Sequence, residues 1–363
     1  MLSTTLKSQT SADITTAITA SVIIVNYDAG AYLQNCLLSL RRTLPPHCEI
    51  ILVDNASTDD SARLVKERFP EVKLLHSDYN LGFAGGNNSG AQLADGRYLV
   101  FLNPDTLVEP GWLQALLGAL ENDPSAGLAT SQIVLMQDPQ QINTCGNEVH
   151  LSGLTLCRAA GLGRDTAGQP SEVGAVSGAA FAIRRDLFER LGGFDPDFFL
   201  YMEDTDLSWR ARLAGYRCLY VPASVVRHDY RLTFGPHKTF YQERNRYLML
   251  LKNLHWGTLL LLAPSLLLAE LVTWGYLLTR QRDQWADKLR AYAWIARHWR
   301  AVMAKRHATQ ALRANRDGQL LQRHTHYLAY EQTGAGLIPR LAHLVFDPLF
   351  FALRRLVLAL VRG

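Results

Sequence analysis

A short apolar run that ends in a polar turn places the strongest constraint on the fold. Residues 98–102 are Tyr-Leu-Val-Phe-Leu, the pattern of a short strand buried on both faces. Pro104 cannot continue a central strand, so the chain has to turn there. Asp105 is therefore placed at the carboxyl end of a buried strand, where open α/β sheets bind their ligands. A carboxylate at that place can hold a divalent metal ion against a diphosphate group.

Strand-like and helix-like segments alternate through the first part of the chain. The expected strands are residues 22–25, 50–53, 72–75 and 98–102, and the expected helices are residues 31–42, 61–69, 85–94 and 111–121. This order predicts an α/β fold with a mainly parallel central sheet covered by helices. Asn26, Asp54 and Asp105 follow three of the strands, so we expect them to converge at one edge of the sheet, the ligand crevice.

The chain divides near residue 240 into two regions of different character. Residues 1–18 are rich in Ser, Thr and Ala and are expected to form a flexible tail, and residues 19–240 are expected to form the α/β domain. Residues 241–363 are expected to form a mostly helical, basic, membrane-associating region. The five cysteines are widely spaced and include no Cys-x-x-Cys pair, which fits a reducing cytosol better than a disulfide framework or a zinc site.

Two apolar stretches with a basic segment between them indicate a membrane surface as a partner. Residues 258–278 are Leu-rich and nearly long enough to cross a bilayer, but Pro264 and Glu270 interrupt them, and an acidic residue at mid-membrane is costly. A helix or bent hairpin lying in the interface is at least as well supported as a span, and a soluble core helix is the third alternative. Residues 280–325 carry eleven Lys and Arg against three Asp, and residues 337–363 combine Phe and Leu with Arg. These neighbours favour anionic lipid headgroups over nucleic acid, for which no binding module is visible.

Polar clusters supply candidates for ligand binding at the sheet edge. Asn26 and Tyr27 follow the first strand, and Asp54 and Asn55 follow the second. A carboxylate there can accept the imide N–H of a pyrimidine base, and an aromatic ring can stack on the base. Taken alone, the residues after the second strand also fit an ordinary capping turn. Residues 80–90 form a Gly- and Asn-rich helix opening through which backbone can approach an anionic ligand, without the P-loop or Gly-x-Gly-x-x-Gly pattern.

A crowded group of carboxylates supplies the catalytic candidates. Glu203, Asp204 and Asp206 fall within four residues, next to apolar and aromatic groups. Such crowding raises at least one carboxyl pKa, which suits a general base working near neutral pH. Capping of a helix start is the ordinary alternative for these acids. His228 follows a later strand and can ligate a metal as a neutral imidazole, although a single His in such a place is commonly structural.

In order and spacing these clusters resemble the family 2 glycosyltransferases, inverting enzymes with the GT-A nucleotide-sugar-binding fold. The similarity covers about residues 21–235, and its most specific segments are residues 53–59, 80–88, 101–105 and 177–206. The subgroup it looks most like is the bacterial rhamnosyltransferases and related enzymes of cell-surface polysaccharide synthesis, such as lipopolysaccharide and O-antigen synthesis.

The resemblance implies a role for each cluster. Asp204 would be the catalytic base with Glu203 beside it, and Asp105 would be the main ligand of a Mg²⁺ or Mn²⁺ ion with His228 as a candidate second ligand. Donor binding would fall to Asn26, Tyr27, Asp54, Asn55, Asn80, Gly82, Asn87 and Asn103. The acceptor or sugar pocket would be formed by Ser177, Gly178, Asp206 and Trp209. Asn103 stands where many relatives have the first Asp of Asp-x-Asp, so metal binding is expected to depend on the donor diphosphate.

The reaction implied is transfer of a sugar from a nucleoside-diphosphate sugar to a hydroxyl of a lipid-linked or cell-surface glycan. The donor would be dTDP-, UDP- or GDP-linked, rhamnose is the sugar by subgroup analogy, and the enzyme would lie on the cytoplasmic face of the bacterial inner membrane, peripheral or interfacial. A nucleotidyltransferase acting on a sugar phosphate is an alternative, but it would need a basic triphosphate loop where residues 26–30 have no Lys or Arg. A non-catalytic, membrane-bound glycan-binding protein is the other alternative, and the joint presence of Asp54, Asp105, Asp204 and His228 argues against it.

Overall fold

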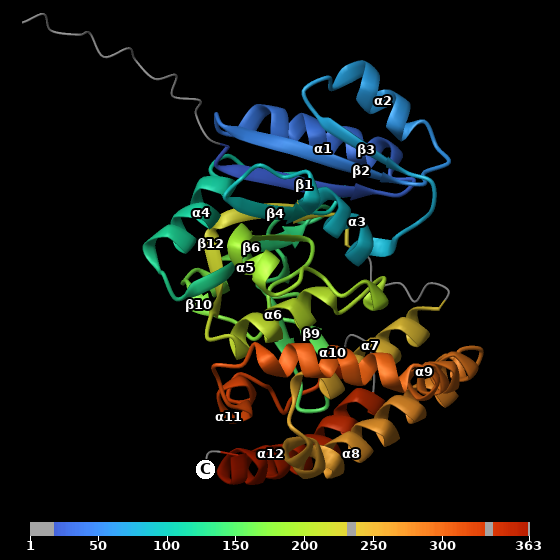
Figure 1. Ribbon diagram of the computed structural model, residues 1–363. Coiled ribbons are helices and arrows are strands. Elements are labelled where there is room, and N and C mark those ends of the chain that lie inside the picture. Colours follow the sequence, from blue (N-terminus) through green and yellow to red (C-terminus); the bar gives the residue numbers. More distant parts are fainter. Residues whose placement is uncertain (1–17, 231–236, 331–336, 362–363) are drawn as a thin grey trace, which may run out of the picture.

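The computed structural model describes residues 18–230, 237–330 and 337–361, so the expected tail of residues 1–18 lies almost entirely outside the described residues. A central sheet with its helices occupies one end of the molecule, and a layer of long helices occupies the other (Figure 1). The predicted α/β class is thus confirmed, with a helical region following it in the sequence.

The central sheet has ten strands, in the order β10-β12-β6-β11-β4-β1-β2-β3, with β5 paired to β12 and β7 paired to β6. The strand bounds are Ala20–Asn26 (β1), Cys48–Asn55 (β2), Lys73–Ser77 (β3), Tyr98–Leu102 (β4), Thr106–Val108 (β5), Ala126–Leu135 (β6), Ile142–Thr144 (β7), Asn147–Val149 (β8), Thr155–Cys157 (β9), Ser171–Glu172 (β10), Ala180–Arg184 (β11) and Arg217–His228 (β12). The four predicted strands are found as β1 to β4 and run parallel. Strand β11 is antiparallel to both of its neighbours, which makes the sheet mixed.

Helices cover both faces of the sheet, which is why β4 is apolar along its whole length. The helix bounds are Gly30–Thr43 (α1), Ser61–Arg68 (α2), Gly82–Gln92 (α3), Trp112–Asn122 (α4), Arg185–Arg190 (α5) and Glu203–Leu213 (α6). Alternate β4 side chains point to opposite faces. Val100 packs in the cluster formed with α1 and α4, whereas Phe101 packs in a second cluster with Phe181 and Phe194. The strand that ends at the Asn-Pro-Asp turn is therefore fixed from both sides.

Six further helices form the second region, and this region packs against the face of α6 that carries Trp209. Their bounds are Lys238–Asn253 (α7), Trp256–Arg280 (α8), Trp285–Arg297 (α9), Trp299–Ala311 (α10), Asp317–Leu321 (α11) and Leu337–Val361 (α12). A third apolar cluster joins Trp209 of α6 to Leu248, Leu262 and Val302 of α7, α8 and α10. Residues 258–278 lie in one continuous helix with Pro264 inside it, rather than in a bent hairpin.

Buried ion pairs also join the two regions. The ammonium of Lys252 on α7 lies 2.6 Å from Asp195 Oδ2 and 3.1 Å from Asp206 Oδ2. Lys305 on α10 pairs with Asp195 and Asp197. Removing one partner of a buried pair leaves an uncompensated charge and is strongly destabilising, so the helical region is part of the folded catalytic unit.

Much of the basic charge of residues 280–325 is used inside the protein. Five of the eleven Lys and Arg residues form ion pairs or hydrogen bonds with other parts of the chain, and these are Lys288, Lys305, Arg306, Arg313 and Arg323. The charge of this segment therefore stabilises the packing of the helices in large part.

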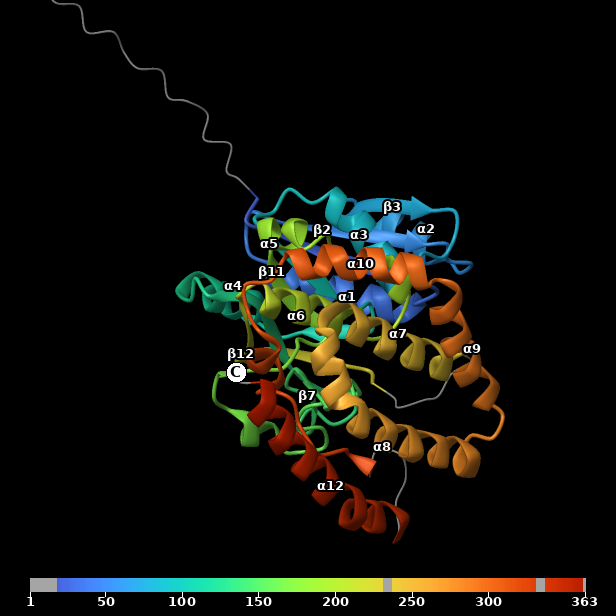
Figure 2. The ribbon, with the colours of Figure 1, turned by 60° about the horizontal axis from the view of Figure 1, so that its bottom comes forward.

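Helices α8 and α12 lie at the end of the molecule away from the sheet and carry exposed leucines (Figures 1 and 2). On α8, Leu260, Leu267, Leu271 and Leu278 recur at the spacing of one helix face and are 54–76% exposed; we call this set the outer stripe of α8. On α12 a similar stripe is formed by Leu341, Val345, Leu349, Leu356 and Leu360. Among the described residues, α8 is the one helix long and apolar enough to cross a membrane by length and composition.

Candidate active site

Strand pairing brings Asp105 and His228 together. Thr106 at the start of β5 is paired with His228 at the end of β12, and the backbone N–H of Asp229 donates to the carbonyl of Asp105 at 3.1 Å. As a result His228 Nε2 lies 3.3 Å from Asp105 Oδ1. The two candidate metal ligands, 123 positions apart in the chain, thus share one corner of the sheet edge.

The geometry of this pair fits a cation. His228 Nδ1 lies 2.9 Å from the amide oxygen of Asn143, which can only accept, so Nδ1 donates this bond, and the neutral imidazole would then present the lone pair of Nε2 toward Asp105. Asp105 Oδ1 is buried and has no hydrogen-bond partner among the described residues. An ion between these two acceptors would relieve their repulsion, and a metal-binding His commonly donates its other N–H in this way. The described residues contain no cluster of three or more His, Cys, Asp or Glu, so an ion here would take its further ligands from water, substrate or neutral protein oxygens.

A groove of about 610 Å³ runs along the sheet edge beside this pair. Six of the predicted donor-binding and metal-binding residues line it with His228, namely Tyr27, Asn55, Asn80, Gly82, Asn103 and Asp105. We call it the donor groove. The amide of Asn55 is fixed by Asn80 Oδ1 at 2.9 Å and by the N–H of Leu81 at 2.8 Å, so the loop before α3 is tied to the end of β2.

Three predicted donor residues lie one layer behind the groove instead of lining it. Asn26 donates to Ser61 Oγ at 2.7 Å and to Asp54 Oδ1 at 3.3 Å. Asp54 is 1% exposed, and its other oxygen lies 2.9 Å from Nδ1 of His76. Asn87 is buried in α3 and donates to the carbonyl four residues earlier. The structure gives these side chains contacts that hold the loops of the groove.

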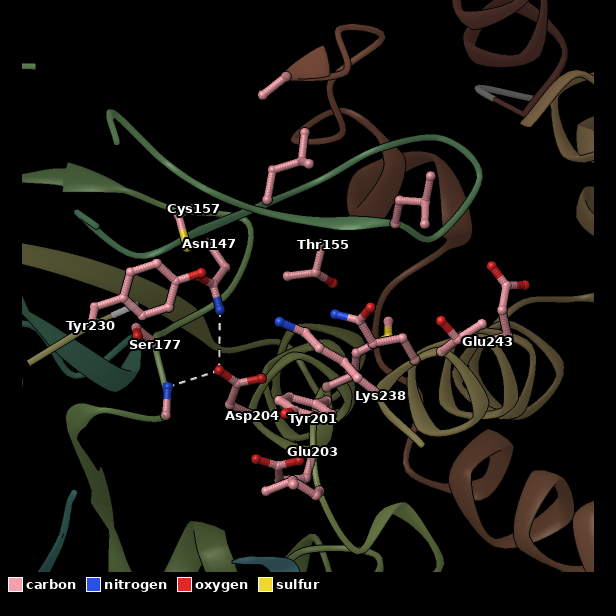
Figure 3. Close-up of a pocket in the computed structure, with 18 of the residues that line it drawn as sticks. Asn147, Thr155, Cys157, Ser177, Tyr201, Glu203, Asp204, Tyr230, Lys238 and Glu243 are labelled. Atoms are coloured by element: carbon pink, nitrogen blue, oxygen red, sulfur yellow. Dashed lines mark hydrogen bonds between the residues drawn. The ribbon is translucent and has the colours of Figure 1, made fainter. Parts of the chain in front are cut away.

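The residues Glu203 and Asp204 begin α6 in a second cavity of about 500 Å³, which we call the acceptor pocket (Figure 3). Asp204 Oδ2 accepts from the N–H of Gly178 at 2.7 Å and from the amide of Asn147 at 3.1 Å. A Cβ on Gly178 would lie 3.3 Å from the same oxygen, so a side chain there would crowd the carboxylate. Burial raises the pKa of Asp204, although these hydrogen bonds favour its charged form.

Glu203 is buried beside Asp204, and its Oε2 has no hydrogen-bond partner in the part of the chain that the structure describes. Burial first, and then the negative charge of Asp204, raise the pKa of Glu203 well above its usual range. The sequence-based expectation of a raised carboxyl pKa therefore holds for both residues, with burial rather than crowding as the main cause.

Asp206 and Trp209 point away from the acceptor pocket, and the structure does not bring them to it. Burial opposes ionisation of Asp206, but Lys252 and Arg210 outweigh it and lower the pKa of this carboxyl. The guanidinium of Arg210 lies 2.8 Å from Asp206 Oδ2. Trp209 is fully buried and stacks on His324 at 4.8 Å between ring centroids. Both face the packing interface with the C-terminal helices, because they lie on the opposite side of α6.

The acceptor pocket and the donor groove meet. Asn103 and His228 line both cavities, and Ser177 and Gly178 line the acceptor pocket as predicted from the sequence. A ligand held at Asp105 would therefore lie beside the cavity that contains Asp204. This junction is the arrangement that a direct transfer between two substrates requires.

Sequence reasoning missed several residues of the acceptor pocket. Asn147 on β8, Tyr230 after β12 and Lys238 at the start of α7 all line it (Figure 3). Asn147 belongs to a short hairpin with no motif around it, and Lys238 lies at the proposed domain boundary. Only the tertiary fold places them, so no local pattern could have identified them.

The loop before α6 has a strained backbone, and hydrogen bonds from helix α7 hold it in place. Phe199, Tyr201 and Met202 have φ values of 56°, 69° and 69°, a region that L side chains rarely adopt. The amide of Asn245 on α7 lies 2.7 Å from the carbonyl of Tyr201 and 2.9 Å from that of Phe198. Helix α7 therefore fixes the backbone that leads into Glu203 and Asp204.

Comparison with known proteins identifies the family of this chain. The family model described as Glycosyl transferase family 2 matches residues 21–192. The chain is 32% identical over 232 residues to the N-acetylglucosaminyl-diphospho-decaprenol L-rhamnosyltransferase of Mycobacterium tuberculosis, covering 57% of this chain and 75% of that protein. It is 28% identical over 219 residues to the O-antigen biosynthesis protein RfbC of Myxococcus xanthus, covering 57% of this chain and 17% of that protein.

Solved structures show the same fold. The GalNAc-T7 structure with UDP, GalNAc and Mn²⁺ superposes with a TM-score of 0.56 at 22% identity, over 65% of this chain and 48% of that one. The S. aureus TarS structure of residues 1–349 with UDP-GlcNAc gives 0.54 at 16% identity, over 94% and 88%. The chain belongs to glycosyltransferase family 2, which confirms the sequence-based assignment of a nucleotide-sugar glycosyltransferase with a GT-A fold.

Proposed function

We propose that the chain is a metal-dependent, inverting transferase that moves a sugar from a nucleoside-diphosphate sugar to a hydroxyl of a lipid-linked or cell-surface glycan. The observation that carries this proposal is the junction of the two cavities, with Asp105 and His228 on one side and Asp204 on the other. The rhamnosyltransferase relative supports rhamnose as the donor sugar, and the GalNAc-T7 structure supports Mn²⁺ or Mg²⁺ as the metal.

Asp204 has one role in the proposed reaction, and Asp105 and His228 share another. Asp204 accepts the proton of the acceptor hydroxyl as that oxygen attacks the anomeric carbon. Asp105 and His228 would hold a divalent ion, which would neutralise the negative charge of the leaving diphosphate. Attack from the acceptor pocket comes from the face opposite the leaving group, so the configuration inverts in one displacement and no covalent glycosyl-enzyme forms.

Glu203 has a distinct role in this proposal. Its raised pKa keeps it protonated at a higher pH than an ordinary carboxyl group, so it can donate a hydrogen bond into the pocket. A protonated neighbour also avoids placing two negative charges side by side when Asp204 acts as the base. Glu203 thus orients a sugar or acceptor hydroxyl, and Asp204 takes the proton.

A screen of dTDP-, UDP- and GDP-sugars for divalent-dependent hydrolysis tests the proposal without requiring the acceptor. We expect one donor to be hydrolysed with Mn²⁺ or Mg²⁺ and not after chelation. The Asp204→Asn enzyme should bind that donor and turn it over only at a background rate. If no nucleotide sugar is bound or hydrolysed, the proposal is wrong.

A nucleotidyltransferase is less well supported. Among the described residues no Lys or Arg lines the donor groove, whereas a triphosphate substrate needs cationic side chains around its phosphates. Release of pyrophosphate from a nucleoside triphosphate would favour this alternative.

We also propose that the outer stripes of α8 and α12 lie in a membrane interface, on the cytoplasmic face of a bacterial inner membrane. Exposed leucines on two neighbouring helices at one end of the molecule form the kind of patch that a monomeric soluble protein rarely shows. The proposal rests on these apolar faces more than on the basic segment, whose charges are largely paired within the protein.

Vesicle binding should fall in Leu267→Glu and should not change in Ala304→Glu, which adds the same charge to an exposed face of α10. Equal binding by the two variants would refute the placement.

A further inference from the structure

The acceptor pocket continues past the catalytic carboxylates into an apolar end. Side chains from three distant parts of the chain line this end, namely Leu154 and Leu156 at β9, Val272 and Leu277 on α8, and Leu328 and Ala329 after α11. They adjoin a small apolar cluster around Ala269, Leu328 and Phe350, which is separate from the cores of the sheet. A sugar hydroxyl would contact only the carboxylate-lined end of the pocket. The apolar end is therefore suited to a different part of the ligand.

A cationic group lies between these two ends. Lys238 is the first residue of α7, is 8% exposed, and extends into the pocket beside Asp204 and Thr155 (Figure 3). The N-terminus of the 16-residue helix α7 adds a partial positive charge at the same place. Glu243 also lines the pocket, but it is paired with Arg246 at 2.6 Å and with Lys288 at 3.6 Å. The middle of the pocket is therefore suited to an anionic group.

The apolar end lies directly behind the outer stripe of α8. Val272, Thr273, Tyr276 and Leu277 line the pocket from one face of α8, whereas the outer stripe, including Leu271 at 67% exposure, lies on the opposite face. Only the thickness of one helix, about 10 Å, separates the pocket from the outer surface. An amphipathic helix in a membrane interface sinks roughly 5–10 Å, so the apolar end would lie near the boundary between headgroups and acyl chains.

We propose that the acceptor pocket binds an acceptor whose hydrocarbon chain occupies the apolar end, whose phosphate lies at Lys238, and whose glycan hydroxyl lies at Asp204. The order of apolar, cationic and carboxylate-lined zones matches the order of groups in a phosphate-linked glycolipid. This inference rests on the proposed glycosyl transfer and adds the class of acceptor and the place of each part.

Three probes test the zones separately in the full-length protein without membranes, with geranylgeraniol kept below its low solubility limit. Geranylgeranyl diphosphate carries both chain and phosphates, inorganic pyrophosphate carries no chain, and geranylgeraniol carries no phosphate. Each methylene group removed from water contributes roughly a fourfold gain in affinity, so geranylgeranyl diphosphate should bind at least tenfold more tightly than pyrophosphate. Geranyl and farnesyl diphosphate should fall between them in order of chain length. Calorimetry below the micelle concentration of each probe measures this series.

Variants then locate the binding. Val272→Asp places a charge in the apolar wall and should weaken geranylgeranyl diphosphate at least tenfold, and Leu156→Ser tests the opposite wall by a milder change. Lys238→Gln should weaken the diphosphates and leave geranylgeraniol unaffected. Leu271→Asp is the matched control, because it adds the same charge one residue away on the outer stripe, and it should keep the affinity of the unmodified protein. Thermal unfolding of each variant confirms that it is folded.

The outcomes separate this inference from the proposed function. Binding of nucleoside diphosphate with Mn²⁺, measured on the same proteins, reports the donor groove alone. If that binding is present while pyrophosphate binds as tightly as geranylgeranyl diphosphate, the lipid site is refuted and the transferase proposal stands. Equal loss in Leu271→Asp and Val272→Asp would place the probe on the outer surface and also overturn the inference. Chain-dependent binding that Val272→Asp abolishes and Leu271→Asp preserves would support it.

Discussion

Two carboxylates on the first turns of α6, Asp204 and Asp206, should respond in opposite ways to the same substitution. Asp206 is fully buried and balances two cations, Lys252 and Arg210. Asp206→Asn leaves Arg210 without its carboxylate partner and leaves Lys252 with Asp195 alone, which costs about 3–5 kcal/mol of unfolding free energy. Its melting temperature should fall by several degrees. Since Asp206 does not line the acceptor pocket, the variant should keep most of its turnover below its unfolding transition.

Asp204→Asn should show the reverse behaviour. The new amide turns one N–H toward a backbone donor, Gly178 or Thr205, at a cost of about 1–3 kcal/mol, and removal of a buried charge offsets part of that cost. Stability should therefore stay close to that of the unmodified protein. Turnover should fall about 10²–10⁴-fold, because the proton of the attacking hydroxyl has no acceptor.

Both variants can be measured with one nucleotide sugar and one denaturation series. Hydrolysis or transfer reports turnover, and equilibrium unfolding with denaturant reports stability. Near-normal turnover in Asp204→Asn would remove this residue from its role as the base. An Asp206→Asn protein as stable as the unmodified one would show that the buried ion pairs do not hold the C-terminal helices to α6.

Three other predictions follow from the site. Asp105→Asn should weaken calorimetric binding of a nucleoside diphosphate with Mn²⁺ at least tenfold and leave metal-free binding unchanged, whereas equal losses would argue against a metal ligand. Burial raises the folded pKa of Glu203 above its unfolded value, so its contribution to stability is complete at acidic pH and is lost as the pH rises through the raised pKa. In Glu203→Gln the unfolding free energy should therefore fall less as the pH rises. A fall equal to that of the unmodified protein would contradict the raised pKa of Glu203. Asn245→Ala removes the hydrogen bonds that hold the strained loop before α6, so it should lower kcat more than it changes the KM of the donor. An effect on KM alone would refute the role of Asn245 in fixing this loop.

The sheet and its ligand edge could be predicted because they depend on local pattern. Short β-prone apolar runs ended by Asn, Asp or Pro identified β1 to β4, and parallel order then placed their polar ends together. The antiparallel strand β11 was not expected, since its pairing between β4 and β6 depends on contacts distant in sequence.

The roles within the carboxylate cluster could not be predicted in the same way. In the sequence Glu203, Asp204 and Asp206 have similar neighbours, so all three were placed at the site. The fold separates them, because Lys252 and Asn253, 46 and 47 positions later, bind Asp206 from the far side of α6. Likewise the sequence pattern favours a lipid-binding surface for the basic segment, whereas nearly half of its basic residues have acidic or carbonyl partners elsewhere in the chain.

The ion pairs of Glu270 indicate that both ends of α8 lie on the same side of a bilayer. This residue stands near the middle of the apolar helix, and its carboxylate binds Arg246 of α7, Lys288 of α9 and the hydroxyl of Tyr292. Insertion of α8 across a membrane would separate Glu270 from these partners and leave two buried cations, Arg246 and Lys288, to share the single carboxylate of Glu243. Helices α7 and α9 also pack on each other, so the segments before and after α8 stay together. A topology assigned from hydropathy would put those segments in different compartments, whereas reporter tags fused in the two loops that flank α8 should be accessible from the same side.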